Sequence, residues 1–465
     1  MEFNSNIIDI KYFQYILVHK SLKDVFLLDT KGGIQPAVEK LFNDLETSGP
    51  ILKSSKEVYI KINGIDAKKH THTSPEVLKA VIQYLKRKGA QVYVMENSTQ
   101  GNMTRIVFGA TEYKKICKET GAKPIYLDEE KSEIFTFRGK PSIQEDNKGY
   151  ILKEFHLPKT IVKIINNRDK ITYINLPKLK THSMAVVTLG IKNQWGFPQH
   201  ADRNKDHNYN LHSKFIDVYE IIKPDLTIID GTEGTIHGHY PPTTLEDQLV
   251  IPFNVLIGGR DTLAVDVVGA RLFGLGLDEV PHLRIAYKRG LGEGDLKQIN
   301  IHGKDITQYN KKYDWNLLDN FPKDVKIVKG KDLLCQEGCK NNPLTTLQVF
   351  SLDYAEKFKG GFFIIMGKGF EENIVDDLKR EGYDRGLVAG FCAIEEVGNK
   401  ILNAFGKKKV YFSHNCNNLA ETITALSKLS TVPIMDLTPI SALKTLKLLI
   451  GAKLHGSKAL IPKIL

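Results

Sequence analysis

Strand and helix patterns alternate in the first part of this chain, and that alternation limits the folds it can adopt. Residues 58–63 (VYIKIN) have the apolar, β-branched character of a strand, and Ser74-Pro75-Glu76 supplies the capping residue, first-turn proline and early acid of a helix. This helix ends at Gly89, and a strand at 91–97, a helix at 104–120 and a strand at 124–128 follow it. A β-α-β-α-β order predicts a doubly wound, mostly parallel α/β sheet.

Further elements extend the pattern and indicate how the chain is divided. Strands are predicted at residues 160–165, 171–176, 226–230 and 253–258, and helices at Thr262–Phe273 and Pro281–Lys288. We expect one α/β domain over residues 1–320 and a smaller α/β domain over 332–440, with a polar, irregular boundary at Asp314–Lys331. In the smaller domain, helices at 344–358, 372–382 and 418–429 alternate with strands at 362–369, 410–414 and 433–437. Residues 441–465 form a C-terminal tail.

Composition excludes several classes of protein. The chain has 465 residues, 42% of them hydrophobic and 26% charged, as in globular domains. It contains no apolar run of transmembrane length, and its first residues lack the pattern of a secretion signal, so we expect a cytoplasmic protein. The net charge of +11 is dispersed and forms no basic stripe interleaved with aromatic residues. Specific nucleic-acid binding is therefore not predicted.

The segment Asn175–His212 concentrates cations around an apolar centre. It holds Lys178, Lys180, Lys192, Arg203 and Lys205 together with four histidines, at 182, 200, 207 and 212, and only two acids oppose them. The apolar run Ala185–Ile191 lies inside the segment, which allows its centre to be buried while cations project at both ends. This arrangement suits a carboxylate or phosphate ligand. A solvated basic loop is the alternative, although such a loop rarely contains an apolar run.

Polar residues at strand ends extend this candidate site. Ligands of open α/β sheets bind at the carboxyl ends of the strands. The residues selected by this rule are Lys61 and Asn63, Glu96 and Asn97, Lys178, Lys180 and His182, Asp230 and Glu233, and Arg260 and Asp261. Each has a structural alternative: Asp261 is better explained as the cap of the following helix, and a structural ion pair explains Lys61 as well as ligand contact does.

Common catalytic motifs are missing. The chain has no Walker-type phosphate loop, no glycine-rich dinucleotide fingerprint between a strand and a helix, and no nucleophile elbow. Nucleotide-dependent and serine-hydrolase functions are therefore not predicted.

Five strings in a fixed order resemble one family. They are KIN at 61–63, INLPKLKTH at 174–182, TLGIKNQWG at 188–196, IIDGTEG at 228–234 and LIGGRDTLAVDVVGARLFG at 256–274. Together they resemble the domain of unknown function 362 family over about residues 57–294, and its members are often described as iron–sulfur proteins. Where the family tends to have a glycine-rich stretch, this chain has TIHGHYPPTT at 235–244, with His237 and His239.

The cysteines are the candidate metal ligands. Cys117 lies in a predicted amphipathic helix and is expected to be a buried thiol, whereas Cys335, Cys339, Cys392 and Cys416 fall in the last third of the chain. The resemblance implies that a late set of this kind holds a 4Fe–4S cluster. Four thiolates also satisfy a structural zinc ion, and unrelated core thiols remain an alternative. Because several of these cysteines are predicted near helix starts, the helix dipole is expected to favour their thiolate form.

The tail, Ser441–Leu465, carries lysines at 444, 447, 453, 458 and 463 and no acidic residue. It is suited to peripheral contact with an anionic membrane surface, but we expect its leucines to dock on the protein itself or on a partner.

The combined features predict an iron–sulfur oxidoreductase, a reductase that acts on a small anionic organic substrate and receives electrons from a ferredoxin-like donor. His182 is the expected proton donor, and Asp230 and Glu233 act as acid/base groups or oppose the lysines. Substrate binding is assigned to Lys61, Asn63, Lys178, Lys180, Lys192 and Asn193. The alternative is a non-redox enzyme or a binding protein for a phosphorylated or carboxylated metabolite, with zinc or no metal on the cysteines. In that case the histidines at 200, 207 and 212 could themselves ligate a metal.

Overall fold

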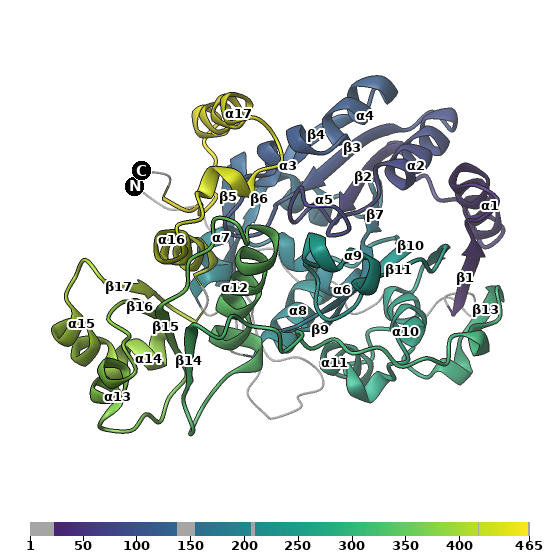
Figure 1. Ribbon diagram of the computed structural model, residues 1–465. Helices are drawn as coiled ribbons and strands as arrows, with labels where there is room; N and C mark the ends of the chain where they lie inside the picture. The colour runs from purple at the N-terminus through teal and green to yellow at the C-terminus, as the bar shows by residue number, and fades with distance from the viewer. Residues whose placement is uncertain (1–22, 137–153, 206–209, 417, 464–465) are drawn as a thin grey trace.

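The main body is built on one large mixed sheet, seen on the right of the computed structural model in Figure 1. The structure describes residues 23–136, 154–205, 210–416 and 418–463. The sheet has eleven strands, and its central path runs β13-β1-β12-β10-β7-β2-β3-β4. These strands are β13 (Asn300–Gly303), β1 (Asp24–Asp29), β12 (Val255–Gly259), β10 (Leu226–Thr235), β7 (Thr172–Leu176), β2 (Glu57–Ile62), β3 (Gln91–Glu96) and β4 (Lys123–Tyr126). On this path only β12 runs antiparallel to its neighbours, which confirms the mostly parallel sheet.

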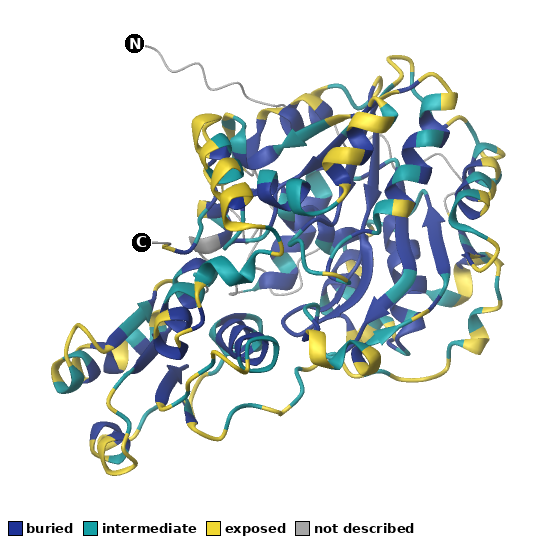
Figure 2. Cartoon of the chain, turned by 45° about the horizontal axis from the view of Figure 1, so that its top comes forward, coloured by how far each residue is buried: buried dark blue, intermediate teal, exposed yellow. Residues whose placement is uncertain are grey.

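Helices cover both faces of this sheet, because its strands are apolar on both sides. Val58, Ile60 and Ile62 of β2 pack on one face with α1 (Ile34–Glu46), α2 (Pro75–Arg87) and α4 (Tyr113–Thr120). Tyr59 faces the other side, where α5, α8, α10 and α11 pack, and by the two-residue period Lys61 shares that side. The bounds of these helices are Lys159–Asn166, Leu211–Ile221, Thr262–Leu272 and Pro281–Lys288. The burial pattern is visible in Figure 2.

Smaller elements lie at the edges of this layer. The further strands of the large sheet are β8 (Lys178–His182), β9 (Val186–Thr188) and β11 (Val250–Ile251), and β5 (Ser132–Thr136) pairs with β6 (Glu154–Pro158) in a separate ribbon. The short helices are α3 (Thr104–Ala110), α6 (Gly190–Asn193), α7 (His200–Lys205) and α9 (Glu246–Leu249).

Three predictions for the main body were wrong or incomplete. Residues 160–165 belong to α5 and not to a strand, since Ile161, Ile164 and Ile165 are buried at helical spacing and their β-branched character was misleading. The helix predicted at 104–120 is two helices, α3 and α4, separated by an extended residue, Thr111. Strand β1, its edge neighbour β13 and helix α1 were not predicted.

The second sheet is small and fully parallel, in the order β14-β15-β16-β17. These strands are Val325–Lys329, Phe362–Met366, Gly386–Ala389 and Val410–Ser413. One face is covered by α12 (Asn341–Asp353) and α16 (Leu419–Ser430), and the other by α13 (Ile374–Arg380) and α15 (Asn399–Phe405). The short helix α14 (Phe391–Ala393) follows β16. Strand β14 lies within the stretch expected to be irregular, and residues 434–437 form a 3₁₀ turn after Pro433 in place of the predicted strand.

The chain returns to the main body at its C-terminal end. Helix α17 (Ala442–Leu454) packs on α3, and the apolar contact joins Met103 and Ile106 to Leu448, Leu449 and Ala452. Figure 1 shows α17 at the top left, away from the small sheet. Within the described ranges, no helix has the length and apolar character needed to cross a membrane.

Candidate functional site

A buried ion pair lies at the carboxyl end of β2. The Lys61 ammonium contacts the Glu96 carboxylate and donates to the Ile62 carbonyl at 2.8 Å. The two side chains are only 1% and 2% exposed. Glu96 also accepts from the backbone N–H groups of Gly64 and Asn97. Burial lowers the pKa of Lys61, although Glu96 opposes this effect. Lys61 therefore forms a structural ion pair, which is one of the two roles that the sequence left open for this residue.

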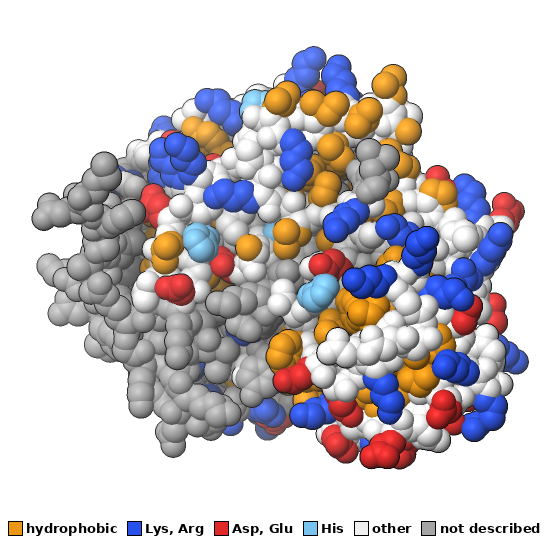
Figure 3. Space-filling view, turned by 90° about the vertical axis from the view of Figure 1, so that its left-hand side faces the viewer, with side chains coloured by type: hydrophobic (Ala, Val, Ile, Leu, Met, Phe, Trp, Pro, Cys, Tyr) orange, Lys and Arg blue, Asp and Glu red, His pale blue; other side chains and the backbone are white. Residues whose placement is uncertain are grey.

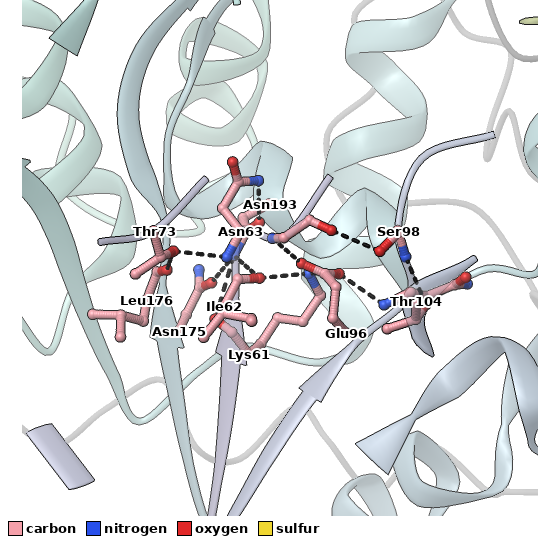
Figure 4. A network of polar contacts seen from close by, with 12 residues as sticks. Lys61, Ile62, Asn63, Thr73, Glu96, Ser98, Thr104, Asn175, Leu176 and Asn193 are labelled. Atoms are coloured by element: carbon pink, nitrogen blue, oxygen red, sulfur yellow. Dashed lines mark hydrogen bonds and ion pairs between the residues drawn. The ribbon is translucent and has the colours of Figure 1, made fainter. Parts of the chain in front are cut away.

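Three asparagines form a ladder beside this pair, as Figure 4 shows. Asn63 Nδ2 donates to Asn193 Oδ1, and Asn193 Nδ2 donates to Asn175 Oδ1, both at 2.8 Å. Asn175 then donates to the Gly190 carbonyl at 2.7 Å. The ladder joins β2 and β7 to the short helix α6, which carries Lys192 and Asn193. Asn63 Oδ1 is buried and has no partner among the described residues, so it is the ladder atom left for a ligand.

A second pair holds Lys178. Its ammonium lies 3.2 Å from Asp230 and 3.4 Å from Glu233. Asp230 is fully buried and also accepts from Ser74 N at 2.6 Å and from the hydroxyl of Thr232 at 2.7 Å. Asp230 and Glu233 thus oppose a lysine, one of their two predicted roles.

Glu233 is held in its ionised form. Burial works to raise its pKa, but a 2.8 Å hydrogen bond with His70 and the charge of Lys178 bring the pKa down to about 2. The same hydrogen bond raises the pKa of His70. His70 has φ of 65°, a left-handed conformation uncommon outside glycine. Sequence analysis did not single out His70, although it follows β2 closely in the string KKHTHT.

Two lysines, the buried Lys180 and the partly exposed Lys192, have no carboxylate partner among the described residues. The Lys180 ammonium contacts the Thr71 carbonyl, and burial together with Lys192 and Lys178 lowers its pKa strongly. The Lys192 ammonium faces the ring of Phe215 at 5.7 Å, and burial together with Lys61 and Arg203 lowers its pKa to about 7. The site therefore contains lysines in excess of its carboxylates, and an anionic ligand would stabilise their charged forms.

His182 forms a stacked pair with His239. The ring centroids are 3.8 Å apart and the planes are nearly parallel, at 2°. His182 Nδ1 accepts from Met184 N at 3.2 Å, so a neutral His182 carries its proton on Nε2. Burial, together with Lys180 and Lys192, lowers the pKa of His239 strongly, and its Nδ1 is buried without a partner in the described chain. His239, whose role the sequence did not indicate, thus lies against the predicted site residue His182.

The hairpin that carries His182 is strained. Val186, at the start of β9, has φ of 68°, which is rare for a β-branched residue. Such backbone strain is concentrated at functional sites, where the surrounding structure maintains it.

The remaining histidines have structural partners. His200 accepts from Leu460 N through Nδ1, and its Nε2 contacts the Ser98 carbonyl, each at 3.0 Å. His212 and His282 share a 3.0 Å hydrogen bond between their Nδ1 atoms. His237 contacts the Asn316 carbonyl at 2.9 Å. These contacts weaken the idea of a histidine metal site at 200, 207 and 212, and His207 lies outside the described residues.

The four late cysteines lie at the carboxyl-terminal end of the small parallel sheet, in the loops that follow its strands. Cys335 and Cys339 follow β14, Cys392 follows β16 and Cys416 follows β17, so all four are at carboxyl ends of strands. A Cβ on Gly390, just before the Cys392 turn, would lie 2.7 Å from Cys339 Cβ and 3.3 Å from its sulfur. Burial raises the pKa of Cys339 to about 11, and the other three thiols contribute to the shift.

Two further observations qualify the metal prediction. The pKa of Cys335 is also raised, by burial and by Cys392, so the expected effect of helix starts on the thiolates is wrong for Cys335 and Cys339. In the described part of the chain, no group of three or more His, Cys, Asp or Glu side chains is arranged to hold a single metal ion. Cys117 is buried on α4, and burial raises its pKa to about 12, as expected for a core thiol.

The cysteine loop touches the cationic site directly. Gln336 and Asn341 donate to the carbonyl of Ser183, at 3.3 and 2.8 Å, and Ser183 is the neighbour of His182. Glu337 accepts from Leu211 N at 2.9 Å. The two halves of the predicted site, separated by about 150 residues in sequence, are therefore adjacent in space.

Fold and site define a class: a two-sheet α/β protein in which a cluster of lysines and histidines lies next to a loop that carries two of four neighbouring cysteines. Residues 58–271 match the family model described as Domain of unknown function (DUF362). This match confirms, over that segment, the resemblance predicted from the sequence.

Two comparisons with individual proteins add distant likenesses. The chain is 24% identical over 287 residues to a thylakoid-associated protein of Synechocystis sp., and the match covers 58% of this chain and 80% of that protein. A crystal structure of a Thermotoga maritima protein is similar with a TM-score of 0.37 and 12% identity, over 84% of this chain and 90% of that one.

Proposed function

We propose that this protein is an iron–sulfur reductase that acts on an anionic organic substrate bound between Lys180, Lys192 and His182. The observation that carries the proposal is the contact between the cysteine loop and Ser183. Because Ser183 follows His182, this contact supports a redox centre near the candidate proton donor and near two lysines that have no carboxylate partner among the described residues.

The four thiols fit a 4Fe–4S cluster by their chemistry and their position. Such a cluster takes four cysteine ligands, and Cys335, Cys339, Cys392 and Cys416 are gathered on three neighbouring loops. Gly390 leaves room for Cys339 where any side chain would collide with it. When bound, the cluster supplies single electrons, which a ferredoxin-like donor would replace.

The protein's own residues would bind and protonate the substrate. Lys180 and Lys192 attract the anion. The side-chain oxygen of Asn63, Oδ1, accepts a hydrogen bond from a substrate hydroxyl or amide. Lys61 and Lys178 are neutralised by their carboxylates and set the field around the ligand. Reduction by two electrons takes up two protons, and His182 Nε2 and the Lys192 ammonium are the groups placed to donate them.

A non-redox anion-binding protein or enzyme is the second candidate. The lysines without carboxylate partners explain anion binding without any electron transfer, and the cysteines would then hold zinc or no metal. A cytoplasmic location and the lack of a nucleic-acid partner stay predictions under either candidate.

Metal analysis of protein purified without oxygen distinguishes the two. The proposal expects visible absorption and about four iron and four sulfide per chain. The double variant Cys335→Ala, Cys339→Ala should lose both, whereas Cys117→Ala, a buried thiol remote from the set, should keep them. A colourless protein with stoichiometric zinc, or full reductase activity in the double variant, would contradict the proposal.

A further inference from the structure

A cavity of about 550 Å³ opens between the main body and the C-terminal helices. Its volume lies within the range of pockets that hold a drug-sized organic molecule. The loops after β2 and β3 form one wall, and α12, α16 and α17 form the others. Most of its lining is apolar, including Met103, Ile106, Val349, Phe350, Ile423 and Leu449. None of these residues had been assigned to a site.

The cavity reaches the candidate active site. His239 and Asn342 line it, and both have a buried polar atom, Nδ1 and Nδ2 respectively, without a hydrogen-bond partner in the described chain. His239 stacks on His182, and Asn342 lies three residues after Cys339. An unpartnered buried donor costs free energy, so these atoms indicate where the polar group of a ligand belongs.

The carboxylates that line the cavity are already paired. Asp353 forms an ion pair with Lys68 at 2.5 Å, and Asp436 forms one with Lys357 at 2.7 Å. The Glu246 carboxylate lies 3.4 Å from the His70 ring. Asp66, the remaining acid, accepts from Asn102 at 3.1 Å and from Lys68 N at 2.9 Å. These contacts reduce the repulsion that an incoming anion would meet.

We propose that the substrate is an amphipathic carboxylate, whose head lies at Asn342, His239 and the nearby lysines and whose apolar body fills this cavity. This inference rests on the proposed function and narrows its substrate class. A small hydrophilic acid would leave the apolar walls exposed to water and would gain nothing from them.

A chain-length series tests this assignment. Straight-chain carboxylates from acetate to decanoate are titrated into the full-length protein by calorimetry. Affinity should rise about fourfold for each methylene group until the cavity is filled, since each buried CH₂ contributes about 0.8 kcal/mol. Decanol, which lacks the charge, should bind at least tenfold more weakly than decanoate. Equal affinity for acetate and decanoate, or for decanol and decanoate, would overturn the proposal.

Two variants separate this inference from the proposed function. Ile423→Trp fills the cavity from its half-buried wall and should abolish the chain-length dependence while leaving the iron and sulfide content unchanged. Ile134→Trp, at a residue 64% exposed on β5, is the control for adding an indole. Cys335→Ala should leave decanoate affinity unchanged even if the cluster is lost. Chain-length dependence that persists in Ile423→Trp would refute the cavity assignment alone.

A second, independent observation concerns the outer face of α17. Leu443, Leu446, Ile450 and Leu454 recur at helical spacing and are 80%, 51%, 49% and 82% exposed. The opposite face of the helix packs on α3. The leucines of the tail were expected to dock on the protein or on a partner. Leu448 and Leu449 contact the protein, whereas the outer face of α17 is uncovered in this single chain, so for that face a partner stays a prediction.

Cations surround this exposed stripe. All five lysines of the tail are exposed, and no acid occurs between Ser441 and Leu465. The acids on the neighbouring segment are engaged, because Glu129 forms two hydrogen bonds with Arg105 and Asp128 accepts from Ser457. Figure 3, which views the molecule from the side of α17, shows apolar side chains interspersed with cationic ones over its upper part.

The geometry points to an anionic membrane surface as the partner of α17. An exposed apolar stripe flanked by lysines matches helices that lie in the lipid headgroup region. The same helix forms part of the cavity wall through Thr445 and Leu449.

Vesicle co-sedimentation tests this surface. Wild-type protein should bind vesicles containing 30% phosphatidylserine and should not bind pure phosphatidylcholine. The triple variant Lys444→Gln, Lys447→Gln, Lys453→Gln should bind on the order of a hundredfold more weakly, since each lysine near the surface contributes about 1 kcal/mol. Leu443→Ser with Leu454→Ser should lose at least about tenfold.

Matched changes on α4, Lys114→Gln, Lys115→Gln and Lys118→Gln, remove the same charge from another exposed helix and should have little effect. Three outcomes would overturn the proposal: no binding by wild type, equal loss in the α4 control, or a wild-type dimer that Leu443→Ser with Leu454→Ser dissociates. The last result would show that the stripe joins two copies of the chain.

Discussion

Replacing Lys192 by methionine should stabilise the ligand-free protein, the opposite of what most substitutions in a packed site do. The Lys192 ammonium has no hydrogen bond or ion pair with a described residue and faces only the Phe215 ring. Methionine has a similar length, is apolar and adapts to irregular spaces. The variant therefore removes a charge that is poorly solvated and keeps most of the packing.

The size of the effect follows from the titration of this lysine. Burial, with Lys61 and Arg203, lowers its pKa from 10.5 to about 7. Each unit by which the pKa is lowered corresponds to about 1.36 kcal/mol. The shift therefore sets an upper limit of roughly 5 kcal/mol on the free-energy cost of keeping Lys192 charged in the folded protein. Lys192 is partly exposed and relaxes toward solvent, so we expect a gain well below this limit, on the order of 1 kcal/mol.

The gain should depend on pH in a defined direction. The unfolded chain binds the Lys192 proton more tightly than the folded chain between pH 7 and 10.5, because the pKa is lower in the fold. The free-energy cost of keeping Lys192 charged in the folded protein is therefore fully present below pH 7, and it disappears as the pH rises toward 10.5. The difference in stability between variant and wild type should be largest at pH 6.5 and smaller at pH 9.5.

Urea unfolding followed by tryptophan fluorescence measures this difference, because Trp195 is buried three residues from Lys192. Lys114→Met, at an exposed position on α4, is the control and should change stability by less than about 0.5 kcal/mol at either pH. A destabilised Lys192→Met protein, or a gain that is the same at both pH values, would refute the view that this lysine is kept for a ligand.

Three more predictions concern the same site and the loops that carry the four late cysteines. Affinity for sulfate, which stays a dianion over this range, should fall as the pH rises through 7, because Lys192 then loses its proton; a flat titration profile from pH 6 to 9 would contradict this. Glu96→Gln should destabilise the protein by about 3–5 kcal/mol in chemical denaturation by leaving Lys61 buried and unpaired, and the double variant with Lys61→Met should recover most of the loss. Gly390→Ala should lower iron content at the neighbouring cysteine, whereas Gly406→Ala, also at positive φ but with open space around it, should not; equal iron content in both would argue against a cluster there.

Much of the architecture could be predicted from local patterns. The alternation after residue 57 gave the parallel sheet, and Asp261 caps α10 as expected, accepting from Leu263 N and Ala264 N. The family resemblance was confirmed over residues 58–271. The failures were also local: residues 160–165 are β-branched but helical, because burial at helical spacing outweighed their strand propensity.

The site was only partly predictable, because its contacts are long-range. Sequence identified Lys61, Lys178 and Lys192 as strand-end or cleft cations but did not determine which of them have carboxylate partners. Glu96 lies 35 residues from Lys61, and Asp230 lies 52 residues from Lys178. Pairing at such distances depends on which loops the sheet order brings together.

The sequence by itself determined the central strands β2, β3, β7, β10 and β12, the residues at their carboxyl ends, the four late cysteines and a lysine-rich tail without acids. Tertiary structure alone decided that Lys192 has no carboxylate partner among the described residues, that Ser183 contacts the cysteine loop, and that one face of α17 is exposed. The physical reason is the range of the interactions. Propensity and periodicity act over a few residues, whereas burial, desolvation and ion pairing depend on segments that only the folded chain brings together.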